Sequence, residues 1–221
     1  MIQIHELSKS YGGRKIFDRV SCQMENGRIY ALVGMNGIGK TTLLQVITQP
    51  ECMDSGTVII DHIESRSFQS KYHFFYVPDS KEMFLNLTGR EYLRFITSLY
   101  RQEPEKAEIM QKGLLESFRL EEAIDTYIAN YSLGMKQKIY MAAALLSGAE
   151  NLILDEPFNG LDPESVLTLK EILAERRDDG AMILFSVHNL ELALDFCDEV
   201  MRIDGEHNLS SVASQSFFNL C

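Results

Sequence analysis

One short stretch, residues 34–42, constrains the fold of this chain more than any other. It contains the pattern G-x-x-x-x-G-K-[ST]. In order, its residues are Gly34, Met35, Asn36, Gly37, Ile38, Gly39, Lys40, Thr41 and Thr42. The apolar run 29–33 precedes it as an expected buried strand, and a segment of helical character, 42–47, follows it. A glycine-rich loop between a strand and a helix predicts an α/β fold with a phosphate-binding loop.

The residue types of this phosphate loop suit a nucleoside triphosphate. Glycines let backbone N–H groups surround an anion without Cβ clashes, and a helix N-terminus adds unpaired donors and a positive dipole end. Lys40 is expected to reach the β- and γ-phosphates, and the Thr41 hydroxyl to ligate Mg²⁺. The alternative, a tight glycine turn that binds nothing, does not account for the Lys-Thr pair or the flanking pattern. No N-K-x-D motif, which reads guanine, is present, so GTP is disfavoured.

The composition favours a globular protein in the cytoplasm. Hydrophobic residues make up 45% of the 221 residues, and the formal net charge of −11 disfavours nucleic acid as a partner. No apolar run approaches the roughly 20 residues that span a bilayer. The N-terminus lacks the basic-then-apolar build of a signal peptide. The scattered cysteines form no C-x-x-C pair and are expected to be reduced thiols: Cys22, Cys52, Cys197 and Cys221.

The order of patterns along the chain predicts one domain, 1–221, with two elaborations. Residues 1–30 are expected to be mainly antiparallel β, with alternation over 2–7 and a hairpin signal at Asn26-Gly27. Residues of about 84–140 hold helical patterns, which begin with a capping box at Thr88-x-x-Glu91, and predict an inserted α-helical subdomain.

Two carboxylates follow a predicted buried strand, 151–154, at the sheet edge where ligands bind in open α/β proteins. Asp155 is expected to face Mg²⁺, and Glu156 to act as general base toward the attacking water. His188 lies just beyond another predicted strand. It either contacts the γ-phosphate or is an ordinary capping or surface residue. Tyr11, in a loop ahead of the core, is either a stacking partner for adenine or an ordinary turn aromatic.

These motifs together carry a family resemblance. The phosphate loop, residues 152–157, 159–163 and 186–188 occur in the order and spacing of the ABC (ATP-binding cassette) family. Residues 131–137, Y-S-L-G-M-K-Q, occupy the place of the L-S-G-G-Q signature of that family. Over nearly all its length the chain resembles the nucleotide-binding domain of an ABC transporter. The resemblance implies a P-loop NTPase (RecA-like) core with an antiparallel β subdomain and an inserted helical subdomain.

The resemblance also implies ATP as the nucleotide and a second ABC ATPase subunit as a partner. In the family, ATP lies between two such domains in head-to-tail arrangement, each phosphate loop facing the signature of the other. Ser132 and Gly134 would then complete the ATP site of the partner, which is a second copy or a different cassette. Tyr11 would stack on adenine, His188 would contact the γ-phosphate, and Asp162 would link the two sites.

The chain departs from the family pattern at two places. Leu133 and Met135 replace the first Gly and the Gln of the signature, a form similar to that of bacterial exporters of drugs and antimicrobial peptides. Asp79 stands where the family has a Gln that reaches Mg²⁺, and it is a candidate metal ligand. A carboxylate there predicts altered metal coordination.

The resemblance implies an ATP-hydrolysing subunit that powers a separate membrane permease, of the exporter type. It would lie on the cytoplasmic face of the membrane and contact the permease near residues 79–85. Two alternatives are a soluble ABC ATPase that acts on a ribosomal or repair complex, and a weakly hydrolysing regulatory module that binds ATP.

Overall fold

The computed structural model describes the chain apart from residues 81, 190, 206–207 and 215–221. By its internal contacts the chain divides into two compact units. Unit 1 comprises Met1–Tyr76, Glu150–Glu156 and Ala174–Cys221, and unit 2 comprises Val77–Ala149 and Pro157–Leu173. Within the described ranges, no helix combines the length and the apolarity needed to cross a membrane.

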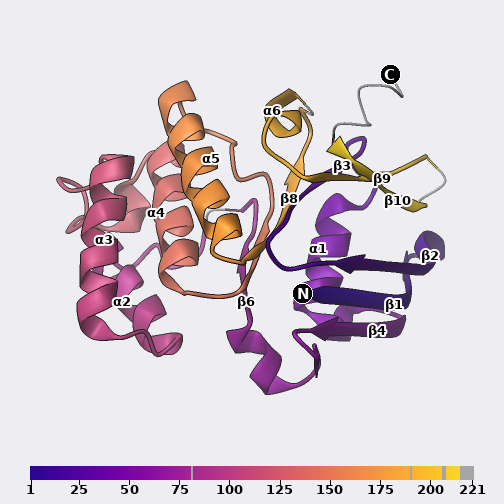
Figure 1. The fold of residues 1–221 in the computed structure, drawn as a ribbon. Coiled ribbons are helices and arrows are strands. Elements are labelled where there is room, and N and C mark those ends of the chain that lie inside the picture. The colour runs from indigo at the N-terminus through magenta and orange to yellow at the C-terminus, as the bar shows by residue number, and fades with distance from the viewer. Residues whose placement is uncertain (81, 190, 206–207, 215–221) are drawn as a thin grey trace. The chain divides into compact units, whose positions relative to one another are not determined.

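A six-stranded sheet forms the centre of unit 1, with strand order β10-β9-β3-β8-β7-β6 (Figure 1). Its strands are β3 (Ile29–Val33), β6 (Phe74–Val77), β7 (Asn151–Leu154), β8 (Met182–Val187), β9 (Glu199–Ile203) and β10 (Leu209–Ala213). Strands β3, β7, β8 and β9 are parallel where they pair, and every residue of β3, β7 and β8 is buried. Continuous apolar runs are typical of parallel strands that are covered on both faces.

The second sheet of unit 1 is antiparallel, with strand order β2-β1-β4-β5. Its strands are β1 (Ile2–Tyr11), β2 (Arg14–Met24), β4 (Ser55–Ile60) and β5 (Ile63–Glu64). The hairpin predicted at Asn26-Gly27 is wrong, because this turn joins β2 to β3, which belong to different sheets. Gly27 does have a positive φ, 67°, but turn chemistry alone does not choose the strand that pairs. Strand β2 pairs with β1 instead, through the turn at Gly12-Gly13.

Helix α1 (Lys40–Thr48) lies in the hydrophobic core of unit 1. Leu43, Leu44, Val46 and Ile47 are wholly buried there, with apolar side chains from both sheets. At roughly 25 cal/mol per Å² of buried apolar surface, side chains of this size each contribute about 1.5–3 kcal/mol. The core therefore holds the helix that begins at the phosphate loop, so the loop is attached at both ends to rigid elements.

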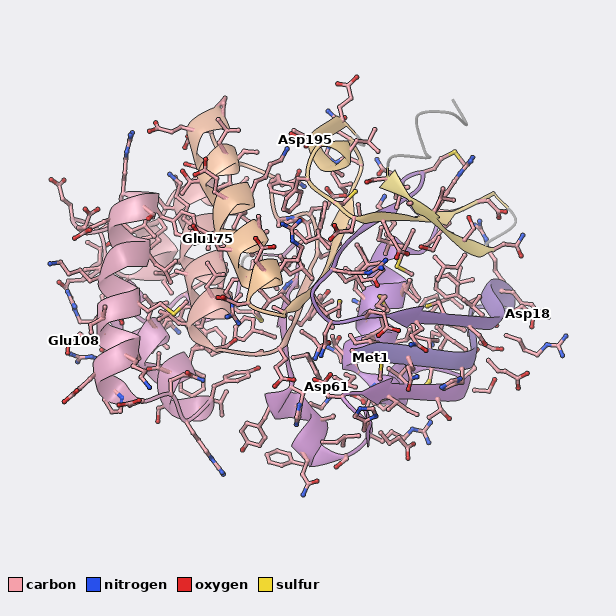
Figure 2. All side chains as sticks on the ribbon, in the orientation of Figure 1. Met1, Asp18, Asp61, Glu108, Glu175 and Asp195 are labelled. Carbon is pink, nitrogen blue, oxygen red and sulfur yellow. The ribbon has the colours of Figure 1, made fainter. Side chains whose placement is uncertain are left out.

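A polar cluster joins the two sheets of unit 1 at the start of β7. The Asn151 side chain donates to Asp61 Oδ2 at 2.6 Å and to the His73 backbone carbonyl at 2.8 Å. Asp61 also pairs with the backbone amine of Met1, and Figure 2 shows the two residues side by side. Since Asn151 is buried and these partners come from separate segments, the cluster fixes the position of β7.

Unit 2 is mainly helical and contains α2 (Gly89–Leu99), α3 (Pro104–Phe118), α4 (Leu133–Leu146) and most of α5 (Pro163–Asp178). The predicted capping box is confirmed, because Thr88 and Glu91 exchange side-chain to backbone hydrogen bonds. Pro104 is the first residue of α3, where a missing N–H costs nothing. The short helices are η1 (Pro50–Cys52), η2 (Phe68–Tyr72), η3 (Ile128–Asn130) and α6 (Glu191–Leu194).

Two glycines give opposite predictions for stability. Gly56 has φ +104°, and a Cβ there would lie 2.7 Å from Leu7 Cα and 2.8 Å from the Glu6 carbonyl oxygen. Gly56→Ala is expected to cost about 3 kcal/mol or more, because backbone atoms must move. Gly113, inside α3, has open space around it, so Gly113→Ala is expected to stabilise by up to about 1 kcal/mol. Urea unfolding of the two variants tests this contrast, and equal midpoints would contradict it.

Candidate active site

The phosphate loop has the backbone geometry that its glycines permit. Gly37 and Gly39 have φ of 75° and 120°, a region that side chains rarely tolerate. A Cβ on Gly39 would lie 2.8 Å from Ile16 Cγ2 and 3.2 Å from Phe17 Cζ. Position 39 therefore requires glycine both for its conformation and for the close approach of β2.

Lys40 is a buried cation at the start of α1. Its Nζ donates to the Gly34 carbonyl oxygen at 2.8 Å, so the ammonium folds back over the loop that precedes it. Thr41 is exposed in the first helical turn and Thr42 is half-buried. In the rest of the loop Gly34 is half-buried, Met35, Asn36 and Gly37 are exposed, and Ile38 and Gly39 are buried. The loop thus combines accessible backbone with a buried cation, which suits an anion.

The register of three parallel strands places the other predicted residues at the same sheet edge. Strand β8 lies between β3 and β7, with Val33 beside Val187 and Leu154 beside Phe185. The phosphate loop, Asp155 and His188 each follow the end of one of these strands. The carboxyl ends of parallel strands share an edge, and this is where ligands bind in such sheets.

Asp155 is suited to hold a cation. Its side chain is almost fully buried, and Oδ1 accepts a hydrogen bond of 2.5 Å from the Ser186 hydroxyl. The other oxygen, Oδ2, is buried and has no hydrogen-bond partner among the residues that the structure describes. A buried carboxylate oxygen without a partner is costly, and a metal ion supplies the missing partner. The residues therefore fit Mg²⁺, which prefers carboxylate and hydroxyl oxygens.

Glu156 has an unusual backbone conformation, with φ +50°. This left-handed region costs a non-glycine residue about 1–3 kcal/mol, so neighbouring contacts must hold it. The Glu156 N–H donates to Ser186 Oγ at 2.9 Å, and Glu156 Oε2 lies 3.0 Å from His188 Nδ1. His188 is exposed and the Glu156 carboxylate is partly exposed, so water reaches this pair.

Sequence reasoning assigned no role to Ser186, although the structure places it between the two carboxylate residues. A signal was present: Ser186 is a polar residue inside the apolar strand β8. A fully buried hydroxyl in such a strand must find partners, and its partners here are Asp155 and Glu156.

Tyr11 lies at the end of β1, opposite Arg14 on β2, and its ring is half exposed. The Lys9 ammonium lies 4.5 Å from the ring centroid, a cation–π distance. The same strand pair supplies Phe17, which approaches the phosphate loop at Gly39. The position is compatible with stacking on a base, and this role stays a prediction.

The signature segment lies in unit 2 at the start of α4. Ser132 is the N-cap, and its hydroxyl accepts the Met135 N–H at 3.2 Å. Gly134 lies so close to Gly160 that a Cβ on it would be 2.7 Å from the Gly160 carbonyl oxygen. Leu133 is exposed. The sequence alone did not predict this close approach, because it joins two loops far apart in the chain.

Two more contacts join α4 to the segment 157–162 within unit 2. The buried Gln137 amide donates to the Pro157 carbonyl oxygen at 2.6 Å, and Lys138 Nζ lies 3.3 Å from Asp162 Oδ2. Asp162 caps α5 by accepting the Ser165 N–H at 2.9 Å. The bonds from Ser165, with the charge of Lys138, hold the pKa of Asp162 well below its usual range. The carboxylate is therefore charged at neutral pH.

The segment 79–85 in unit 2, of which residue 81 lies outside the described residues, has an exposed carboxylate and exposed apolar side chains. Asp79 is exposed, and Met83 and Phe84 are about 40% exposed. The Phe84 ring also stacks on Tyr92, with centroids 4.9 Å apart, and lies 5.7 Å from Phe95. Phe84 thus packs on the helices and remains accessible to a partner at the same time.

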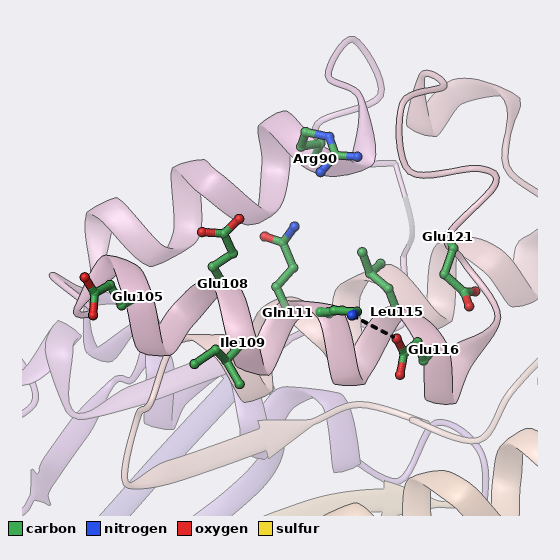
Figure 3. A pocket seen from close by; sticks show the side chains of 9 residues that line it. Arg90, Glu105, Glu108, Ile109, Gln111, Leu115, Glu116 and Glu121 are labelled. Atoms are coloured by element: carbon green, nitrogen blue, oxygen red, sulfur yellow. Dashed lines mark ion pairs between the residues drawn. The ribbon is translucent and has the colours of Figure 1, made fainter.

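A surface pocket of about 580 Å³ lies in unit 2, and Figure 3 shows its lining. Four glutamates line it: Glu105, Glu108, Glu116 and Glu121. Of its two cations, Lys112 lies 3.9 Å from Glu116, and Arg90 is bound to Asp125 by two hydrogen bonds. Because acidic side chains predominate, this pocket does not suit a nucleotide phosphate.

Lys40→Ala tests the role of the buried ammonium. Hydrogen bonds to charged groups contribute about 1.5–3 kcal/mol, so affinity for a fluorescent ATP analogue is expected to fall about 10- to 100-fold. Lys71→Ala is the matched control, because Lys71 Nζ donates to the Thr48 carbonyl oxygen at the other end of α1, at 2.7 Å. Equal affinity of the two variants in equilibrium titrations would contradict a phosphate contact of Lys40.

Comparison with known proteins places this geometry in a family. Residues 17–159 match the ABC transporter family. The ATP-binding protein AlbC of Bacillus subtilis (strain 168) is 34% identical over 206 residues, which cover 90% of this chain and 85% of AlbC. The lipopolysaccharide export system ATP-binding protein LptB of Escherichia coli (strain K12) is 29% identical over 206 residues, which cover 91% of this chain and 86% of LptB.

One solved structure similar to this chain is an ATP-binding subunit of an ABC transporter. The similarity covers 100% of this chain and 92% of that subunit. The two are 28% identical and superpose with a TM-score of 0.93, which confirms the predicted P-loop α/β fold. The resemblance inferred from the motifs is confirmed as well, since the family match includes the phosphate loop and the strand before Asp155. This chain belongs to the ABC transporter family and is one of its ATP-binding proteins.

Proposed function

We propose that this protein is the ATP-hydrolysing subunit that powers a separate membrane permease, and that this permease is an exporter. The observation that carries the proposal is the group at one sheet edge of unit 1: phosphate loop, Lys40, Asp155, Glu156 and His188. The signature form with Leu133 and Met135 supports export, as does the similarity to a protein named for lipopolysaccharide export. The protein would be cytoplasmic and bound to the membrane through its permease.

The phosphate loop and Lys40 bind the triphosphate. Backbone N–H groups of residues 34–42 and the N-terminus of α1 face the phosphate oxygens, and the Lys40 ammonium turns from its own loop carbonyl toward them. Thr41 and Asp155 would hold Mg²⁺, and Asp79 is an additional candidate ligand. When bound, Mg²⁺ supplies positive charge that offsets the charge of the phosphates. Tyr11 is proposed to stack on adenine.

Glu156 is proposed as the general base. Its carboxylate accepts a proton from the water whose oxygen attacks the γ-phosphorus. The bond between the γ-phosphorus and the oxygen that bridges it to the β-phosphate breaks, and ADP and inorganic phosphate leave. His188, at 3.0 Å from Glu156, orients the carboxylate and is placed to contact the γ-phosphate. Positioning and charge stabilisation supply most of the rate, as in other phosphoryl transfers.

Two ATPase subunits are proposed to close head to tail around ATP. Ser132 and the backbone of Gly134 would complete the ATP site of the partner subunit, with the free N–H groups at the start of α4. Residues 1–221 would act as a single ABC ATPase domain, in which the insertion at about 84–140 carries the signature. Binding of ATP closes the pair and hydrolysis reopens it, which couples chemistry to motion of the permease.

The permease is proposed to contact the segment from Asp79 to Leu85. Met83 and Phe84 supply accessible apolar surface in this segment, and exposed apolar surface favours a protein partner. The net charge of −11 disfavours a nucleic-acid complex as the alternative partner.

Glu156→Gln is expected to lower turnover about 10²- to 10⁴-fold while ATP binding persists, because the amide keeps the size of the side chain but accepts no proton. The ATP-bound variant is expected to accumulate as a dimer in size-exclusion chromatography. Turnover is measured as the release of inorganic phosphate. Glu150→Gln is the control, because Glu150 is an exposed residue directly before β7. Unchanged turnover in Glu156→Gln would remove Glu156 from the base role.

Met83→Glu is expected to prevent recovery of the permease when the tagged protein is isolated from detergent-solubilised membranes, because a charge enters the apolar contact. Met110→Glu on α3 is the matched control, since Met83 is 40% exposed and Met110 37% exposed. Mass spectrometry identifies a polytopic membrane protein in the control and the wild type. Recovery of ribosomal or repair proteins with no membrane protein would replace the transporter function by the soluble alternative.

A further inference from the structure

Ser186 makes two hydrogen bonds of opposite sense in the core of unit 1. The side chain is fully buried in β8. Its oxygen accepts the Glu156 N–H at 2.9 Å, and its hydroxyl donates to Asp155 Oδ1 at 2.5 Å. A hydroxyl has one proton, and an ionised carboxylate only accepts, so the direction of both bonds is determined. One side chain thus contacts both carboxylate residues of the site.

We propose that Ser186 is a positioning residue, which directs Asp155 Oδ2 toward the metal and holds the backbone of Glu156 in its left-handed conformation. The proposal rests on the proposed function in one respect: Asp155 is the residue that holds Mg²⁺.

The first effect of Ser186 is on the orientation of Asp155. The terminal torsion of an aspartate is soft, so a carboxylate with no partner samples many orientations. The short bond from Ser186 occupies Oδ1 and leaves Oδ2 as the oxygen without a partner among the described residues. Residues that hydrogen-bond to a metal ligand typically change metal affinity about 10- to 100-fold when they are removed.

The second effect is on the backbone of Glu156. Strand β7 ends at Leu154, level with Phe185, so the Glu156 N–H lies beyond the regular pairing with β8. The Ser186 hydroxyl takes the place of a backbone acceptor there. Without it, a polar N–H would lose its partner at a residue that already has φ +50°. Because the Glu156 carboxylate contacts His188, a shift of this backbone also displaces that pair.

Three variants separate positioning from general stability. Ser186→Ala removes the hydroxyl without adding atoms, so it introduces no clash. Ser186→Thr keeps a hydroxyl. Ser70→Ala is the matched control, because Ser70 is also fully buried in unit 1 and its hydroxyl bonds two backbone carbonyls, at 2.9 and 2.7 Å.

The first measurement is the affinity for Mn²⁺, read by electron paramagnetic resonance in the presence of a non-hydrolysable ATP analogue. Ser186→Ala is expected to bind Mn²⁺ at least about tenfold more weakly than the wild type. The second is the affinity for the same analogue in EDTA, which is expected to stay within about twofold because the phosphate loop and Lys40 are unchanged. Ser186→Thr is expected to recover Mn²⁺ affinity, and Ser70→Ala to match the wild type in both.

Two outcomes would overturn the proposal. In one, Ser186→Ala binds Mn²⁺ as the wild type does. In the other, Ser186→Ala loses affinity for the analogue in EDTA as much as for Mn²⁺, which would make Ser186 merely structural. The proposed function is tested separately. Absence of ATPase activity in the wild type would contradict the proposed function. A selective loss of Mn²⁺ affinity in Ser186→Ala would still support the positioning role of Ser186.

Discussion

The parallel register of β3, β8 and β7 is the constraint on which the site in unit 1 depends. Strand β8 lies between the other two, so the segments that follow the three strands meet at one edge. A shift of one residue between β7 and β8 would turn the Ser186 hydroxyl to the opposite face of the sheet and away from Asp155. The apolar side chains on both faces prevent that shift, because every residue of these strands is buried. Hydrophobic burial therefore determines the geometry of the polar groups.

The same burial makes the charges at this edge effective. Lys40 and Asp155 are ionisable groups with little exposure to water, and a buried charge without a partner costs several kcal/mol. Lys40 has the Gly34 carbonyl as a partner, and Asp155 has the Ser186 hydroxyl on one oxygen only. Charges held in a medium of low dielectric interact strongly with an incoming ion. Burial that makes Lys40 and Asp155 costly to keep charged therefore also favours the binding of an ion of opposite charge to each of them.

Local patterns predicted most of the elements, and the errors have a common cause. The capping box at Thr88 and the strands before the phosphate loop and Asp155 depend on nearby residues, and all are confirmed. The separation of β2 and β3 into different sheets and the approach of Gly134 to Gly160 depend on residues far apart in the chain. The role of Ser186 belongs to the same class, because its partners come from another strand.

Glu156, the last residue of its stretch of unit 1, is followed directly by a segment of unit 2 that is bonded to the start of α4. Pro157 follows Glu156 directly, and its carbonyl oxygen accepts a hydrogen bond from the buried Gln137 amide of α4. Gly134 lies close to Gly160 and Lys138 pairs with Asp162, so several contacts hold the segment 157–162 against the start of α4. Glu156, one residue before this segment, has φ +50°, and its N–H is bonded to the Ser186 hydroxyl in unit 1. Within one peptide bond the chain therefore passes from a segment bonded to α4 to a strained residue that a contact with β8 must hold.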